Sequence, residues 1–403
     1  MKIVFFLEYQ KKNGNRYTLH GDFATIKGAE EFFRHATGGE LREGQEIPTG
    51  LRIDGIIPGI RLFEDNYYTL DVDCAIITRT ENTSFESYII DYSNVSFEQY
   101  KKVIERDTKA QNNLDKAKSR MPKGKVASVF HSFDDLCDDE KEFVLVNDVG
   151  QGNWNEYHCG NNIPLVFDIG ADRYASNKSA RSLIGQILPQ YQSLEKKPVV
   201  IISHWDLDHY RCLLSMSDLE INLFDCFIVM ETLPTATAKK AYDLIEKNLG
   251  VNILAVTERL PTKKAASLMI HPLHKAKKLS IYQGVGNNTN NTGFIVAVSN
   301  NHTIVLLSGD CSWSQLNHLT RAEGQHKKKR LCHLVVPHHG SGKDCCYKGF
   351  VLPSSWLYGK AAVSVGINMY GHPNPGVLKY LNSLFGSHAS RTDKTKTAIR
   401  LKM

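Results

Sequence analysis

The strongest chemical signal in the sequence is the segment HWDLDH at positions 204–209. Two imidazoles and two carboxylates follow directly on the apolar run 198–202. Imidazole and carboxylate are usual ligands of divalent metal ions, and a loop that leaves a strand can aim successive side chains at one point. Packing alone rarely explains such a cluster, because each buried polar group would need a partner. The segment therefore favours a metal site over the alternative, a solvated polar loop.

Further ligand-type side chains end two other apolar runs. Asp310 closes the run 302–310, and His338 and His339 follow the run 331–337. Adjacent histidines do not easily bind the same ion, so we expect one to bind metal and the other to pack or hydrogen-bond beside it. The sequence does not choose between these two. The candidate metal ligands are His204, Asp206, Asp208, His209, Asp310, His338 and His339.

The elements that must position these side chains are strands that alternate with helical patterns. Apolar runs that predict strands lie within residues 141–154, 163–170, 197–209, 295–300, 302–310, 331–340 and 360–368. Residues 179–197 predict a helix between the second and third of them, and the Asn-rich stretch 286–291 predicts a loop. Strands whose ends carry His and Asp, joined by helices, indicate an α/β layered domain with its site at the strand ends.

The first third of the chain lacks a catalytic motif. Residues 1–95 alternate short apolar runs with turn residues, which predicts a mostly-β module of unknown role with a helix near residues 28–35. Residues 96–135 predict a connector whose segment 97–125 forms a charged helix, and a solvated connector is favoured over a nucleic-acid contact. Residues 136–403 would then form the α/β domain that carries the candidate metal site.

Composition sets the broad class. The chain has 403 residues with 42% hydrophobic and 23% charged side chains, so it is long enough for one large domain plus a smaller module and shows no large-scale disorder. A net charge of +6 is compatible with a polyanionic partner such as nucleic acid, although many enzymes of this size carry a similar charge.

Cysteine usage and hydropathy bear on location. The nine cysteines are scattered and form no CxxC pair, which indicates a reducing compartment and mostly buried free thiols rather than a disulfide framework. The first apolar run, residues 3–7, is too short for the core of a signal peptide, and no run approaches the roughly 20 residues that span a bilayer. We therefore expect a cytoplasmic protein with no membrane partner.

Taken in order, the three ligand motifs resemble the metallo-β-lactamase superfamily. The usual first motif is His-x-His-x-Asp-His, and Asp206 stands here in place of its second histidine. Over residues 140–403 the chain is most similar to the C-terminal hydrolase domain of ComEC-type DNA-internalisation proteins. The blocks that carry this likeness are DVGQGN at 148–153, NNTGFIV at 290–296, VPHHGSGKD at 336–344, SVGINMYGHPNP at 364–375 and RTD at 391–393.

The sequence departs from that family at several points. Tyr210-Arg211-Cys212 stand where Gly-Gly is usual after the first motif, and Gly293 stands in place of a serine. The long membrane-spanning region of the DNA-uptake channels is absent, and the likeness does not reach residues 1–135.

The resemblance implies a metallo-β-lactamase αββα sandwich, of class α/β, with the mostly-β module as an N-terminal extension. It implies two divalent ions, with His204 and Asp206 on the first and Asp208 and His209 on the second. Asp310 would bridge them, and His338 or His339 would complete the second. Because carboxylates form much of this set, manganese is as credible as zinc.

The resemblance also implies a mechanism. Two ions about 3.5–4 Å apart polarise a substrate oxygen and lower the pKa of a bridging water toward about 7. The catalytic candidates are Asp208, His372 and Lys343. His372 would protonate the leaving oxygen, unless it serves only in a Gly-His-Pro turn. Residues expected to orient the ligands or assist with charge are Asp148, Asp168, Asn290 and Arg391.

Three functions remain open at this point. The first is a phosphodiesterase or nuclease that acts on nucleic acid. The second is a hydrolase of a small molecule such as a lactone, thioester or cyclic nucleotide, because the fold alone does not fix the substrate. The third is a non-enzymatic protein that binds a protein partner through its N-terminal module. The extra module also suggests the hypothesis of an antiviral defence effector that stays inactive until a partner triggers it.

Overall fold

The computed structural model describes residues 1–41, 47–58, 60–64, 66–73, 75–79, 87–92, 104–107, 126–130, 141–173, 175–259, 269–325, 329–342, 346–366, 368, 370–386 and 389–403. The chain divides into two compact units. The first comprises Met1–Arg120 and Thr232–Asp243, and the second comprises Met121–Glu231 and Leu244–Met403. None of the helices in these described ranges has the length and apolarity needed to cross a membrane.

The first unit is built on one mixed sheet with the strand order β5-β6-β3-β2-β1-β4-β7. Its strands are β1 (Lys2–Asn13), β2 (Arg16–Phe23), β3 (Gly50–Ile56), β4 (Asn66–Asp71), β5 (Ile76–Arg79), β6 (Ser87–Asp91) and β7 (Ile104–Arg106). Helix α1 (Ile26–Thr37) begins where the Thr25 side chain accepts a hydrogen bond from the Gly28 amide, and it buries Ala29, Phe32 and Phe33. The prediction of a mostly-β module with a helix near residues 28–35 is confirmed.

Strand β7 corrects the prediction of a charged helix over residues 97–125. Residues 104–106 pair antiparallel with β4, and the Ile104 side chain is buried in the core of the unit. Helical propensity is a weak preference, and the open edge of β4 offers both backbone hydrogen bonds and an apolar contact. The rest of the predicted helix, residues 97–103 and 108–125, lies outside the described residues.

A segment that comes much later in the sequence belongs to the first unit. Residues Thr232–Asp243 include Pro234, whose carbonyl accepts a hydrogen bond from Tyr67 Oη at 2.5 Å. Lys240 Nζ donates to the Ile47 carbonyl at 3.0 Å, and Ala236 joins the buried core of the unit. The first unit is therefore assembled from two separate stretches of chain.

Asp22 makes the stability of the first unit depend on pH. Burial raises the pKa of its carboxyl to about 7, although hydrogen bonds with Thr237 and Thr235 and the charge of Lys240 oppose this. The pKa in the unfolded chain is about 3.9, so the folded state holds the proton more tightly between about pH 4 and 7. Stability is therefore lost as the pH rises through this window, by up to about 4 kcal/mol.

Asp22→Asn is expected to remove this loss, because the amide stays neutral at every pH. Relative to wild type, the variant should gain stability steadily from pH 5 to pH 7.5, as measured by denaturant unfolding of the full chain at each pH. A difference between the two proteins that does not change with pH would show that Asp22 is not the titrating group.

The second unit contains two further sheets. The first has the order β13-β12-β11-β10-β9-β8-β21. Its strands are β8 (Glu142–Val146), β9 (Asn155–Cys159), β10 (Asn162–Phe167), β11 (Val199–Ile201), β12 (Cys226–Met230), β13 (Ile253–Val256) and β21 (Ile399–Lys402). Strands β10 to β13 are parallel, so their carboxyl ends share one edge. Every residue of β11 and β12 is buried.

The other sheet has the order β14-β15-β16-β17-β18-β19-β20. Its strands are β14 (Met269–Lys275), β15 (Leu279–Val285), β16 (Phe294–Ser299), β17 (Thr303–Leu307), β18 (Arg330–Val335), β19 (Trp356–Val363) and β20 (Ala389–Arg391). Strands β17 to β20 are parallel, so this sheet also gathers several carboxyl ends at one edge.

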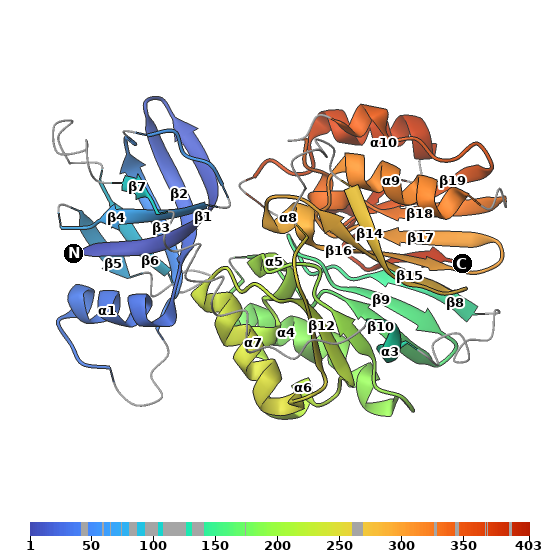
Figure 1. Cartoon of the computed structure of the whole chain (residues 1–403), viewed down its shortest axis with the longest axis horizontal. Coiled ribbons are helices and arrows are strands. Elements are labelled where there is room, and N and C mark those ends of the chain that lie inside the picture. The colour runs from blue at the N-terminus through green and yellow to red at the C-terminus, as the bar shows by residue number, and fades with distance from the viewer. Residues whose placement is uncertain are drawn as a thin grey trace. The chain divides into compact units, whose positions relative to one another are not determined.

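Helices cover the outer faces of these two sheets. The longer ones are α4 (Asn177–Ile187), α9 (Trp313–Gly324) and α10 (Pro375–Phe385), while α7 (Ala236–Leu249) begins in the segment of the first unit and ends in the second. The second unit also contains short helices and helical turns, several of them at strand ends: α3 (Val126–Val129), η5 (Leu188–Ser193), α5 (Leu207–Tyr210), η6 (Leu213–Ser215), α6 (Asp218–Ile221), α8 (Thr289–Thr292), η7 (Pro337–Gly340), η8 (Cys346–Gly349) and α11 (Thr392–Thr395). Figure 1 shows α4 on the side of the first sheet and α9 and α10 on the side of the second. The predicted αββα sandwich with an N-terminal mostly-β extension is confirmed.

The cysteines follow the sequence prediction in part. Cys212, Cys226, Cys311 and Cys332 are buried free thiols, and the free thiol of Cys346 is exposed. Cys159 is disulfide-bonded. The expectation that most cysteines are buried free thiols holds for the first four, and Cys159 is an exception to it.

Candidate metal centre

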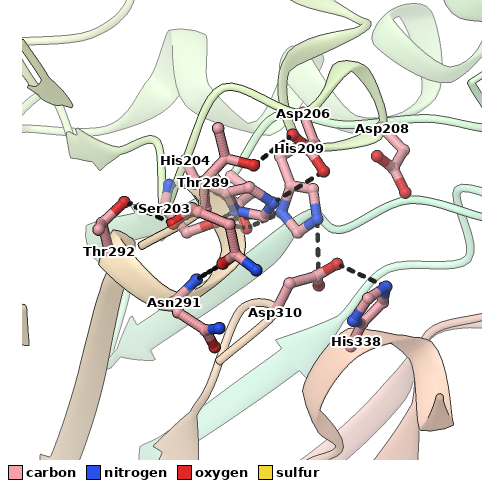
Figure 2. Close-up of polar contacts among 12 residues, drawn as sticks. Ser203, His204, Asp206, Asp208, His209, Thr289, Asn291, Thr292, Asp310 and His338 are labelled. Carbon is pink, nitrogen blue, oxygen red and sulfur yellow. Dashed lines mark hydrogen bonds and ion pairs between the residues drawn. The ribbon is translucent and has the colours of Figure 1, made fainter. Parts of the chain in front are cut away.

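The candidate site lies where parallel strands of both sheets end. From the first sheet, β10 leads into Asp168 and β11 leads into the segment 203–209. From the other, β17 leads into Asp310 and β18 leads into the pair at 338–339. Figure 2 shows His204, His209 and Asp310 close together, with Asp206 and Asp208 at one side and His338 at the other. The ends of parallel strands are a common place for ligand sites in α/β proteins, because several loops meet there.

Close backbone packing fixes the loop that carries the first motif. The Ile169 amide donates to the His209 carbonyl at 2.9 Å, and the Asn153 amide donates to the Asp208 carbonyl at 3.2 Å. A Cβ atom on Gly170 would lie 1.8 Å from the Asp208 carbonyl oxygen, so only glycine allows this approach. Backbone contacts with the neighbouring loops therefore hold Asp208 and His209 in place.

Hydrogen-bond partners indicate which ring nitrogen of His339 and His209 carries the hydrogen. Nδ1 of His339 lies 2.8 Å from the Ser364 carbonyl oxygen, which can only accept, so Nδ1 carries the hydrogen. Nδ1 of His209 lies 2.8 Å from Asp168 Oδ2 and donates in the same way. A neutral imidazole with its hydrogen on Nδ1 keeps a lone pair on Nε2. Both rings are therefore set to bind a cation through Nε2.

His204 reaches the same state through Ser203. The Ser203 hydroxyl donates to Asp168 Oδ2 at 3.0 Å, and the Ser203 amide donates to Asp168 Oδ1 at 2.6 Å. The hydroxyl oxygen can then accept from His204 Nδ1, which lies 3.0 Å away. Asp168 is itself buried, with a positive φ of 66° that turns it toward the site. One carboxylate thus orients two rings, directly and through a serine.

Four buried atoms of these ligand-type side chains make no hydrogen bond with the described residues, which favours a bound cation. Nε2 of His204, His209 and His339 and Oδ1 of Asp310 are buried, and none makes a hydrogen bond with another described residue. Asp310 Oδ1 lies 3.2 Å from His209 Nε2 and 3.8 Å from His339 Nε2. Buried polar atoms without partners are costly, and a divalent cation would satisfy lone pairs of all four. The residues present therefore fit a metal ion.

The ligand atoms fall into two overlapping groups. One comprises His204, His209 and Asp310, and the other comprises Asp208, His209 and His339, with the atoms of each group within 4.8 Å of one another. Asp206 Oδ2 lies 3.5 Å from His204 Nε2, so this carboxylate stands beside the first group. The expected pairing of His209 with Asp208 is present, but His209 also stands in the group of His204.

The structure distinguishes the two adjacent histidines. The His339 side chain is 2% exposed and its Nε2 lies 3.2 Å from Asp208 Oδ2. The His338 side chain is 27% exposed and its Nε2 lies 3.6 Å from Asp310 Oδ2. Both residues have positive φ, at 48° and 50°, so the chain turns sharply and separates the two rings. The geometry favours His339 as the ligand and leaves His338 at the margin of the cluster.

Electrostatics favours charged carboxylates in this cluster. Burial alone would raise the pKa of Asp310, but the neighbouring His338, His209 and His339 hold it well below its usual range. Burial would likewise raise the pKa of Asp208, but the neighbouring His339 and His209 lower it. Both carboxylates are therefore ionised at neutral pH, as a metal ligand must be.

Residues 289–292 correct the prediction of a loop over 286–291. They form one helical turn, α8, which begins where Asn288 Oδ1 accepts a hydrogen bond from the Asn291 amide at 2.9 Å. An asparagine at this position satisfies an amide that the helix cannot, which is why so short a turn forms. The turn brings Thr289 Oγ1 to 3.3 Å from Asp206 Oδ1 (Figure 2).

The other predicted site residues lie in varied places. The His372 ring packs edge-on against the His338 ring, with centroids 5.4 Å apart. Arg391 donates two hydrogen bonds to Asp393, at 2.8 and 2.6 Å. Burial raises the pKa of Asp148, whose charged neighbours are Lys396 and Asp393. Asn290 Oδ1 is buried and makes no hydrogen bond with the described residues. Lys343 lies outside the described residues.

Sequence reasoning missed three side chains or groups that hold the site together. Ser203 directly precedes the first motif, and its place between a strand and a ligand histidine was a usable signal. The Ser364 carbonyl orients His339, but any residue offers a carbonyl, so the sequence carries no signal for it. Arg211 stands where glycine was expected, and its guanidinium donates to the Ala175 carbonyl and to Asn177 Oδ1, each at 2.8 Å. It thus anchors the loop that follows residue 171.

No protein-family model and no curated protein matches the sequence. Among solved structures, the chain is similar to the metallo-β-lactamase fold protein YhfI from Bacillus subtilis, with 11% identity and a TM-score of 0.36 over 65% of this chain and 100% of that one. It is similar to the short form of human tRNase Z, with 11% identity and a TM-score of 0.35 over 62% and 92% of the two chains. It is also similar to a mutant of the CmlA β-hydroxylase, with 9% identity and a TM-score of 0.36 over 66% and 54%. Likenesses this remote assign no activity, which must be argued from the atoms of the site.

Proposed function

We propose that this protein is a metal-dependent hydrolase, and that its substrate is a phosphodiester, most simply a nucleic acid. The observation that carries the first part is the convergence of three buried imidazole nitrogens and one buried carboxylate oxygen that lack hydrogen-bond partners among the described residues. A divalent ion held by such a set supplies Lewis acidity and an activated water.

The donor set supports a phosphodiester substrate. Asp206, Asp208 and Asp310 supply carboxylates beside the three imidazoles, and such a mixed set suits Mn²⁺ as well as Zn²⁺. The charge of the buried Arg173 acts on Asp206, so a cationic side chain lies near this end of the cluster. Phosphoryl substrates need such positive charge around the reacting atoms, and the net charge of +6 suits a polyanionic substrate.

The chain's own residues divide the work in this proposal. His204, Asp206, His209 and Asp310 would hold one ion. Asp208 and His339 would hold the other, together with either His209 or Asp310. Water attacks phosphorus and gives up a proton to solvent, the bond from phosphorus to the leaving oxygen breaks, and that oxygen takes a proton. His372 is the proposed donor of this proton, because it is only partly buried and stands against His338 at the margin of the cluster.

Purified full-length protein should cleave linear DNA, circular DNA or single-stranded RNA when supplied with Mn²⁺, Mg²⁺ or Zn²⁺. The control is the double variant Asp208→Ala, Asp310→Ala, which should be inactive and should bind less metal by elemental analysis. Bound metal without cleavage of any nucleic acid would move the proposal to a small-molecule substrate. Absence of both cleavage and metal would refute it.

The same assay addresses the defence hypothesis. An effector that waits for a partner should show little cleavage when pure, although its metal sites are filled. Full activity of the pure protein on any nucleic acid would count against such regulation.

A further inference from the structure

We propose that Thr289 is a positioning residue that aims the Asp206 carboxylate at the metal centre and thereby sets the affinity of the ion nearest His204. This inference rests on the proposed function, because it requires that the cluster bind metal. It goes further in assigning a role to a side chain outside the ligand motifs.

The Asp206 carboxylate needs a neighbouring group that fixes its orientation. A carboxylate at this position is shorter than the imidazole that the first motif usually carries, and it can rotate about its last torsion. Thr289 Oγ1 donates to Oδ1 at 3.3 Å, which leaves Oδ2 on the side of His204, 3.5 Å from Nε2. That Nε2 atom is one of the buried atoms that make no hydrogen bond with the described residues. One oxygen of Asp206 is thus committed to Thr289 and the other faces the site.

The backbone around Thr289 is fixed relative to the first motif. The Phe294 amide, just beyond α8, donates to the Ser203 carbonyl at 2.8 Å. Gln315 Nε2 donates to the Asn291 carbonyl at 2.7 Å, which ties α8 to α9. A Cβ atom on Gly284 would lie 2.2 Å from the Asn291 carbonyl oxygen, so β15 packs directly beneath the turn. The hydroxyl of Thr289 is therefore held in place by the fold, as a group that orients a ligand must be.

The local charges agree with this role. The charge of Arg173 acts on the Asp206 carboxylate, which lies beside His204. A hydroxyl that donates to the carboxylate also favours its charged form. Thr289 supplies that hydrogen bond without adding a second positive charge, so it does not repel the cation that Asp206 would bind.

The test compares Thr289→Val, which keeps the shape and loses the hydroxyl, with Thr289→Ser, which restores the hydroxyl. Titration calorimetry with Mn²⁺ on the full chain should show that Thr289→Val lowers the affinity for one Mn²⁺ ion by about 10- to 100-fold. The affinity for the other ion should stay near that of wild type. Ser should recover most of the loss. Electron paramagnetic resonance of Mn²⁺-loaded protein should change from the signal of two coupled ions to that of an isolated ion in the Val variant.

Thr292→Val is the matched control. Thr292 lies in the same turn, but its hydroxyl donates to the carbonyls of Asn288 and Thr289 and not to a ligand. An equal loss of affinity in this variant would show that α8 matters only as a structural turn, which overturns the proposal. If wild type binds two ions and Thr289→Val binds Mn²⁺ with unchanged affinity, this inference is overturned. The proposal of a metal centre is not affected by that result. Wild-type protein that binds neither Mn²⁺ nor Zn²⁺ overturns both.

Discussion

Asp310→Asn is expected to abolish hydrolysis, with a loss of at least about 10²- to 10³-fold, and to lower the metal content of the purified protein. Asp310 follows a strand of one sheet and lies against His209, which follows a strand of the other. Its Oδ1 lies 3.2 Å from His209 Nε2, and its Oδ2 lies 3.6 Å from His338 Nε2. An amide at this position has no negative charge, and its NH₂ group would face nitrogen atoms or a cation.

Activity and metal stoichiometry should be measured together on this variant. The control is Asp22→Asn, which makes the same substitution at another buried aspartate, in the first compact unit. It should retain wild-type metal content when assayed below pH 7. A variant of Asp310 that keeps both metal and activity would contradict the placement of the site.

Asp168→Asn is expected to weaken metal binding by about 10- to 100-fold, although Asp168 itself touches no ion in the proposal. Oδ2 of Asp168 accepts from both the Ser203 hydroxyl and His209 Nδ1. With asparagine, Oδ1 can still accept from the Ser203 amide, but the NH₂ group then faces two donors. His209 would respond by accepting at Nδ1 and placing its hydrogen on Nε2, where the ligand lone pair must be.

The change should also reduce stability, because a buried network that loses its acceptor typically costs about 1–3 kcal/mol. Thermal unfolding in the presence of a chelator separates this loss from the loss of metal. Asp225→Asn, at an exposed aspartate before β12, is the control and should change neither quantity. Normal metal affinity in Asp168→Asn would mean that Asp168 supports the loop without setting the state of His209.

Several features of this protein follow from the sequence by itself. The spacing of apolar runs predicted the strands that end at His204, Asp310 and His338, because burial on both faces leaves a continuous apolar pattern. The clustering of ligand-type residues at those ends predicted the cluster itself. Both signals are local, since each is contained within about ten residues of chain.

Tertiary structure decided what depends on contacts between distant segments. His339 and His338 are adjacent and chemically identical, and only the left-handed turn and the Ser364 carbonyl separate their surroundings. The hydrogen bond from Thr289 to Asp206 depends on α8 packing beside a motif more than eighty residues earlier in the chain. Residues 104–106 became a strand because β4 offered an open edge.

The same reason explains the composition of the first unit. Two of the contacts that join residues 232–243 to the first unit are made to backbone carbonyls: the Tyr67 hydroxyl donates to Pro234, and the Lys240 ammonium donates to Ile47. Backbone groups are the same at every position, so a contact made through them leaves no trace in the sequence. The sequence thus determined which side chains carry the chemistry, whereas the fold decided how each of them is oriented.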